Sequence, residues 1–203
     1  MKNNRVSSMA ILSLFIAIEV VLTLTPLGFI QIGLIRSTTL HIPVILAGLL
    51  LGYKQASIIG LVFGILSVLT NTFMPTATSF IFTPFYSIGN INGNIFSLVI
   101  AIIPRVLFGC ISLFVYKLLY KVNVESIRVF ISSCIGSIMH TIMVMFGIYI
   151  FFGPQYASVK DVNINDLLNL IYVVITTNGI IEMLVGSIIV TGTYKTLKKV
   201  IKR

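Results

Sequence analysis

Ionisable side chains lie inside long apolar stretches of this sequence, where a charge is costly. They are Glu19, His41, Arg105, His140 and Glu182. Arg105 follows Pro104 near the middle of the run SLVIAIIPRVLFGCISLFVY. Its guanidinium keeps its charge, and its planar fork matches a carboxylate. We therefore expect Arg105 either to pair with an acid of the chain or to receive an anionic ligand.

Two acids could neutralise Arg105, namely Glu19 and Glu182, but two acids and one arginine do not balance. Asn178 and Glu182 are four residues apart in TTNGIIE, which places both on one helix face. This spacing predicts an amide and a carboxylate at one cavity. They would contact a ligand or Arg105, or else form hydrogen bonds between helices.

The histidines leave two interpretations open. His140 lies on a polar stripe with Ser137 and Thr141, so it either contacts a ligand or is a satisfied buried side chain. His41, two residues before Pro43, is predicted at a helix boundary, where it is either a boundary residue only or also a substrate contact. Catalysis by His140 with Ser137 is disfavoured, because a three-residue spacing on one helix aligns them poorly for proton transfer.

Sequence motifs for other chemistry are missing. The chain has no G-x-x-x-x-G-K-[ST] phosphate loop, no H-E-x-x-H zinc spacing and no G-x-S-x-G elbow. Its two cysteines, Cys110 and Cys134, lack metal or redox spacing and are predicted to pack as small apolar residues. We expect no cofactor, no metal and no enzyme activity. Uphill transport would need an ion gradient or another subunit.

The composition places these residues in a membrane. Of 203 residues, 57% are hydrophobic and 9% charged, and the mean hydropathy is +1.08. The apolar runs are continuous, which predicts helices that cross the bilayer rather than barrel strands. We expect one all-α integral membrane domain over residues 1–203, a bundle of six transmembrane helices. The predicted spans are Met9–Leu27, Thr39–Leu51, Gln55–Phe73, Phe96–Tyr116, Val129–Phe152 and Leu168–Tyr194, of which the second is short and could borrow residues from the preceding loop.

The distribution of basic residues predicts the topology. With both termini in the cytoplasm, all 14 basic residues except Arg36, Lys160 and the buried Arg105 lie inside. The net charge of +9 is then explained by topology and not by a nucleic-acid partner. The C-terminal YKTLKKVIKR is expected to face anionic membrane lipid.

Three outer loops connect the predicted spans, and the middle one has an unusual composition. These loops are Thr25–Thr38, Asn71–Ile95 and Gly153–Asn165. The middle one carries the aromatic residues Phe73, Phe80, Phe82, Phe85 and Tyr86. Such side chains are unusual on a solvated loop. We expect this loop to form a lid over an outward-facing pocket, or else to rest on lipid.

Small residues mark two places of close helix approach. Gly60 and Gly64 form a G-x-x-x-G pair in the third span, and Ser13 and Ala17 form a small-xxx-small pair in the first. Either pair could serve packing within the chain or docking of a partner.

The chain resembles the substrate-binding S components of bacterial energy-coupling factor (ECF) vitamin transporters over nearly its whole length. The resemblance lies in TTLHIPVILAGLLLGYKQASIIGLVFGILSVLTNTFMP, SFIFTPF, AIIPRVLFG and NGIIE, and is strongest to the pantothenate-type branch. It implies a bacterial six-helix membrane protein that captures a vitamin from outside under closing loops. It also implies docking to a transmembrane coupling subunit and two cytoplasmic ATPases. The family's A-x-x-x-A docking motif corresponds here to Ser13 and Ala17, with one conservative change.

The resemblance supplies no fixed pocket motif, so the site remains an inference from residue chemistry. We expect pantothenate as ligand, with its carboxylate on Arg105. The same site would be lined by Asn178, Glu182, His140 and His41. The alternatives are another vitamin or precursor (riboflavin, a thiamine-related compound, pyridoxine or folate) or an autonomous ion-coupled transporter. With a neutral or cationic vitamin, Arg105 would instead pair with Glu182.

Overall fold

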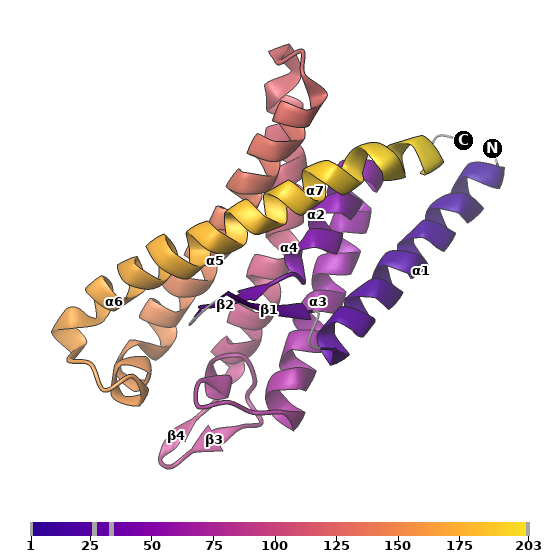
Figure 1. Cartoon of the computed structure of the whole chain (residues 1–203). Helices are drawn as coiled ribbons and strands as arrows, with labels where there is room; N and C mark the ends of the chain where they lie inside the picture. The colour runs from indigo at the N-terminus through magenta and orange to yellow at the C-terminus, as the bar shows by residue number, and fades with distance from the viewer. Residues whose placement is uncertain (1, 26–27, 33–34, 202–203) are drawn as a thin grey trace.

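The computed structural model describes residues 2–25, 28–32 and 35–201, and it is almost entirely helical (Figure 1). The helices are α1 (Lys2–Leu24), α2 (His41–Leu51), α3 (Tyr53–Phe73), α4 (Ile95–Leu118), α5 (Glu125–Val159), α6 (Leu167–Val174) and α7 (Ile180–Ile201). The other elements are the hairpin β1 (Phe29–Ile32) and β2 (Ile35–Thr38), the hairpin β3 (Ser87–Ile88) and β4 (Ile91–Asn92), the 3₁₀ turns η2 (Ser79–Ile81), η3 (Leu119–Lys121) and η4 (Ile164–Asp166), and the π-helical segment η5 (Ile175–Gly179).

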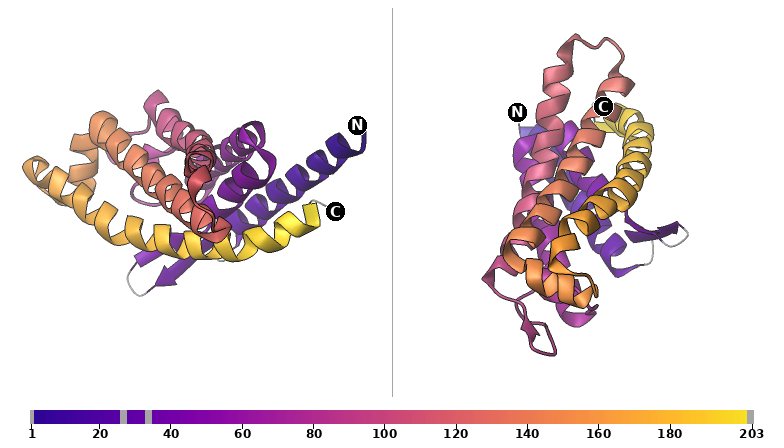
Figure 2. Two further views of the ribbon diagram at one scale, coloured as in Figure 1. Left: turned by 90° about the horizontal axis from the view of Figure 1, so that it is seen from above. Right: turned by 90° about the vertical axis from the view of Figure 1, so that its left-hand side faces the viewer.

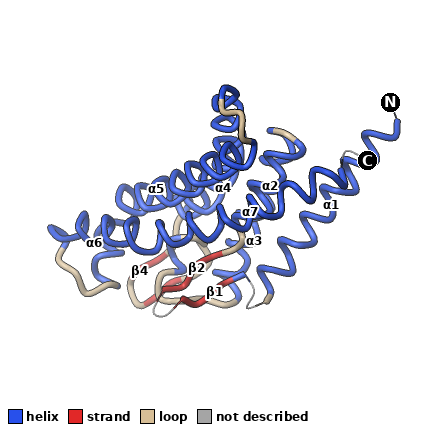
Figure 3. Tube along the Cα trace, turned by 45° about the horizontal axis from the view of Figure 1, so that its top comes forward, coloured by secondary structure: helices blue, strands red, loops and turns tan. Residues whose placement is uncertain are grey.

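The predicted all-α membrane bundle is confirmed. Helices α3, α4 and α5 and the run from η4 through α7 are each long and apolar enough to cross a bilayer. Helix α1 contributes a shorter apolar segment, Ser8–Leu24. The start of α1 and the end of α7 lie at the same end of the bundle, and the β3–β4 hairpin lies at the other (Figures 1 and 3).

Helix α2 is the shortest of the predicted spans, with 11 residues. At 1.5 Å per residue it extends roughly 16 Å, about half of a hydrocarbon core. The preceding loop does not lengthen this helix, because β1 and β2 form an antiparallel hairpin there. Residues from His41 to Leu49 are all buried, so neighbouring helices enclose α2 and separate it from lipid.

Helix α5 extends further than predicted, through most of the expected loop Gly153–Asn165. Phe152 has φ −135° and ψ 18°, which marks a kink inside the 35-residue helix. Pro154 follows two residues later, and its ring cannot fit under the carbonyl of the preceding turn. The sequence-based span therefore ended at the kink, whereas the helix resumes after it and ends at Val159.

Helices α3 and α4 pack closely through the predicted G-x-x-x-G pair. A Cβ atom on Gly60 would lie 2.1 Å from the backbone oxygen of Arg105, and one on Gly64 would lie 3.0 Å from that of Ala101. Only glycine permits this approach of the two backbones. The pair therefore serves packing within the chain, and it fixes the height of Arg105 against α3.

The loop between α3 and α4 folds back onto the bundle. Phe80 is fully buried against Phe152, with ring centroids 5.7 Å apart. The Ser97 hydroxyl at the start of α4 donates to the Phe80 carbonyl at 2.7 Å. Of the other predicted lid aromatics, Phe82 and Tyr86 are half-buried, and Phe73 and Phe85 are exposed.

The end of α7 is fastened to the α4–α5 turn. Glu125 accepts hydrogen bonds from the Tyr116 hydroxyl at 2.9 Å and from the Tyr194 hydroxyl at 3.3 Å, and it pairs with Lys198. Lys198, which belongs to the basic C-terminal run, is therefore engaged within the protein.

Candidate functional site

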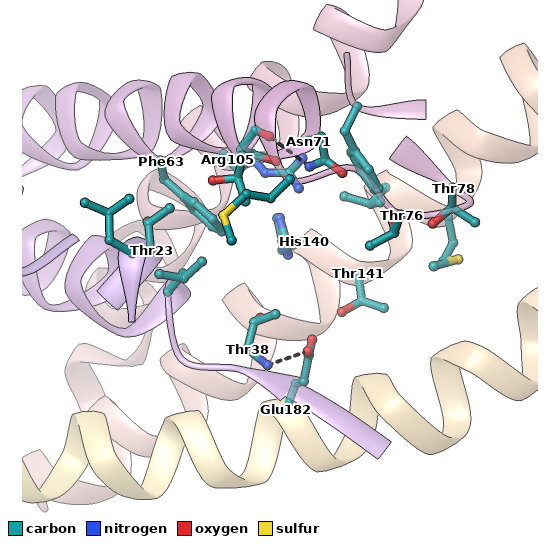
Figure 4. Close-up of a pocket in the computed structure, with 18 of the residues that line it drawn as sticks. Thr23, Thr38, Phe63, Asn71, Thr76, Thr78, Arg105, His140, Thr141 and Glu182 are labelled. Atoms are coloured by element: carbon teal, nitrogen blue, oxygen red, sulfur yellow. Dashed lines mark hydrogen bonds between the residues drawn. The ribbon is translucent and has the colours of Figure 1, made fainter. Parts of the chain in front are cut away.

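A cavity of about 620 Å³ lies between the end of α1, α3, α4, α5 and α7 (Figure 4). The base of the β1–β2 hairpin and the α3–α4 loop complete its wall. This volume is in the usual range for small-molecule sites. Hydroxyl and amide side chains are frequent in the wall; they include Ser67, Thr70, Asn71, Thr76, Thr78 and Thr141.

Arg105 lines this cavity and is only 7% exposed. Pro104 has no N–H, so the carbonyl of Ile100, four residues earlier, loses its helical donor. The Arg105 Nη1 atom donates to that carbonyl at 2.7 Å. The adjacent proline and arginine are thus explained together, because the guanidinium satisfies the acceptor that the proline leaves unpaired.

Two aromatic rings hold the Arg105 guanidinium. Its central carbon lies 5.3 Å from the ring centroid of Phe63 on α3 and 5.2 Å from that of Phe82 in the α3–α4 loop. Cation–π attraction stabilises the charge at these distances. Within residues 2–25, 28–32 and 35–201 no acid forms an ion pair with Arg105, and its Nε atom has no hydrogen-bond partner. The cavity therefore presents a cation without a counter-ion from the described part of the chain.

His140 enters the same cavity from α5, beside Arg105 (Figure 4). Its ring contacts Phe108, with centroids 4.9 Å apart, and lies 6.3 Å from Phe63. The Nε2 atom is buried and has no hydrogen-bond partner in the described residues. An imidazole nitrogen in this position can donate to or accept from a polar ligand.

Glu182 reaches the cavity from α7, and its carboxylate is already engaged. The backbone N–H of Thr38, at the end of β2, donates to Glu182 Oε1 at 2.9 Å (Figure 4). Glu19, the other acid considered as a partner for Arg105, is fully buried on α1 and does not line the cavity. The permanent pair between Arg105 and an acid, one of the two alternatives from the sequence, is not formed by Glu182 or Glu19.

Comparison with known proteins identifies the family. The sequence model described as "ECF transporter, substrate-specific component" matches residues 7–194. The chain belongs to this family. It is also 34% identical over 202 residues to the pantothenic acid transporter PanT of Lactococcus lactis subsp. cremoris (strain MG1363), an alignment that covers 98% of this chain and 97% of the relative. The predicted S component is thereby confirmed as a multi-pass cell-membrane protein.

Two predicted site residues of this substrate-specific component lie away from the cavity wall. Asn178 belongs to η5, where the π-helical turn holds more residues than an α-turn. Glu182 lines the cavity and Asn178 does not, so the two side chains predicted at one cavity are not both in its wall. His41 is buried at the start of α2 and packs against Gly186 of α7.

Sequence reasoning missed one wall of the cavity. The missed wall consists of Phe63, Ser67, Thr70 and Asn71 on α3 and of Met74 directly after it. Their spacing of four, three, one and three residues follows one helix face. The polar residues Ser67, Thr70 and Asn71 on one face near the end of an apolar helix are a signal that the sequence carries, whereas Phe63 is apolar like its neighbours and carries none.

The predicted docking residues of the substrate-specific component lie on a free face of α1. Ser13 and Ala17 are exposed, beside Met9, Leu14 and Val21, which are 68%, 59% and 55% exposed. The Ser13 hydroxyl donates to the Met9 carbonyl of its own helix at 3.0 Å. The described part of the chain leaves this face uncovered. The side chains at its centre are small, and those at its borders are large and apolar.

Proposed function

We propose that this substrate-specific component binds pantothenate on the outer side of the cell membrane and delivers it with a coupling subunit and two ATPases. The observation that carries the proposal is the Arg105 guanidinium, held at the cavity wall with no acid partner among the described residues. Pantothenate supplies the missing carboxylate. The relative named as a pantothenic acid transporter supports the same ligand.

The chemistry of the wall suits the rest of that molecule, which has one amide and two hydroxyl groups. In the proposed complex the carboxylate lies on Arg105, between Phe63 and Phe82. The amide and hydroxyl groups contact His140 and the hydroxyl-rich end of α3. Because Phe82 comes from the α3–α4 loop, this loop would also exclude water from the charge pair.

The orientation follows from charge. The basic end of α7 and the α4–α5 turn lie opposite the β3–β4 hairpin (Figure 1). The positive-inside rule places that basic end in the cytoplasm and the β3–β4 hairpin outside. The exposed α1 face around Ser13 and Ala17 is the proposed docking surface for the coupling subunit.

A binding panel tests the proposed ligand. We expect the purified chain in nanodiscs to bind pantothenate by calorimetry, and to bind the cation thiamine and the neutral riboflavin at least about a hundredfold more weakly, because Arg105 is left unpaired or repels them. Tight binding of thiamine or riboflavin without pantothenate binding would contradict the proposal. Ion-driven accumulation of pantothenate by this chain alone in liposomes would instead support an autonomous transporter.

A further inference from the structure

Strand β2 ends with a backbone group that its own hairpin does not use. Phe29 and Thr38 are paired in the β1–β2 register, and the next N–H, that of Thr39, donates to the Gly28 carbonyl at 3.0 Å. Hydrogen-bonded and non-bonded pairs alternate along an antiparallel ladder. The Thr38 N–H therefore points away from β1, where it donates to Glu182 Oε1.

A second contact, one turn further along α7, joins that helix to the start of α2. A Cβ atom on Gly186 would lie 2.0 Å from His41 Nε2, so the imidazole packs directly on the α7 backbone. Glu182 and Gly186 are four residues apart on α7, which places them on one face. The junction between the β1–β2 hairpin and α2 is thus docked on α7 by Thr38 and His41 together.

This docking closes one wall of the cavity. Thr38 and Glu182 both line it, and the hydrogen bond between them spans the line where the hairpin meets α7 (Figure 4). The hairpin projects from the side of the bundle next to α7 (Figure 2). Its attachment on this side depends on few contacts, and such elements open at low free-energy cost.

We propose that Glu182 is a positioning residue that latches the base of the β1–β2 hairpin onto α7, and that release of this latch admits and frees the ligand. The proposal rests on pantothenate binding in this cavity. It gives the Glu182 carboxylate a different role from the ligand contact expected from sequence. A latch lowers the association rate and the dissociation rate of the ligand equally, whereas a contact to the ligand lowers the dissociation rate alone.

Kinetics with pantothenate separate the two roles. The variants are Glu182→Ala, which removes the acceptor, and Glu182→Gln, which keeps an acceptor oxygen without the charge. For Glu182→Ala we expect association and dissociation rates in stopped-flow experiments both to rise about tenfold, with the dissociation constant changed less than about threefold. The matched control Asp166→Ala removes an exposed carboxylate outside the cavity and is expected to behave as the unmodified protein. A rise in the dissociation rate alone in Glu182→Ala would overturn the latch in favour of a ligand contact.

Hydrogen exchange tests the latch without any ligand. In the ligand-free protein, the Thr38 amide should exchange at least about tenfold faster in Glu182→Ala than in the unmodified chain or in Glu182→Gln, because only alanine lacks an acceptor. Equal protection in all three proteins would overturn the latch. Failure of every form to bind pantothenate would refute the proposed function, and exchange at Thr38 would still decide the latch.

Discussion

The Arg105→Ala variant is expected to bind pantothenate more than about 2 kcal/mol more weakly than the unmodified protein, roughly a thirtyfold rise in the dissociation constant. The substitution would leave a carboxylate in a buried pocket without its cation. The pocket offers no substitute, since no other Lys or Arg lines the cavity in the described residues. Calorimetry on protein in nanodiscs measures the effect directly.

Two further variants separate the contribution of the planar guanidinium donors of Arg105 from that of its positive charge. Arg105→Lys keeps a cation but loses the planar pair of donors, so binding should fall by about tenfold, less than in the alanine variant. Lys160→Ala removes an exposed cation near the end of α5 and should leave affinity unchanged. Arg105→Ala also leaves the Ile100 carbonyl without its partner, so thermal unfolding of each variant must show that the fold is intact. Near-native affinity in a folded Arg105→Ala protein would remove this residue from the site.

The Gly60→Ala variant is expected to have the largest effect on folding. Its new methyl group would lie 2.1 Å from the backbone oxygen of Arg105, so α3 and α4 must separate. Overpacking of this kind costs about 1 to 3 kcal/mol, and contact with rigid backbone places Gly60 at the upper end of that range. We expect a clearly lower midpoint of thermal unfolding in detergent.

The chain provides a matched control for this glycine. A Cβ atom on Gly192 in α7 has no atom within 4 Å, so Gly192→Ala adds the same methyl group to a helix in open space. Alanine is the better helix former, so this control should unfold at an equal or higher temperature. Because the Gly60 methyl group presses on Arg105 itself, pantothenate affinity should fall with stability in Gly60→Ala only. Equal unfolding midpoints for the two variants would contradict the close contact between the α3 and α4 backbones.

Much of the fold could be predicted because the bilayer allows few structures. Long apolar runs must be helices with their backbone groups paired internally, and Gly60 and Gly64 mark where two of them meet. Arg105 stood out for the same reason, as a permanent charge in an apolar run. The sequence left two partners open for Arg105, an acid of the chain or an anionic ligand. Only the positions of Glu19 and Glu182 in the structure excluded those two acids.

Other features depended on local backbone geometry that periodicity does not reveal. Asn178 lies in the π-helical segment Ile175–Gly179 and does not line the cavity that Glu182 lines, and no residue type in TTNGIIE indicates such a segment. The predicted span ended at Phe152, where the structure has a kink, and periodicity did not reveal that α5 resumes after this kink. The hydrogen bond from Thr38 to Glu182 joins residues 144 positions apart, a contact set by the fold as a whole.

The central claim is that Arg105 recognises the carboxylate of the ligand. Pantothenol, in which an alcohol replaces that carboxylate, allows a four-corner comparison with pantothenate on the unmodified protein and on Arg105→Ala. We expect a coupling free energy of at least about 1.5 kcal/mol, with Arg105→Ala binding the two compounds almost equally. A coupling near zero, with both compounds weakened to the same extent by the substitution, would contradict the account.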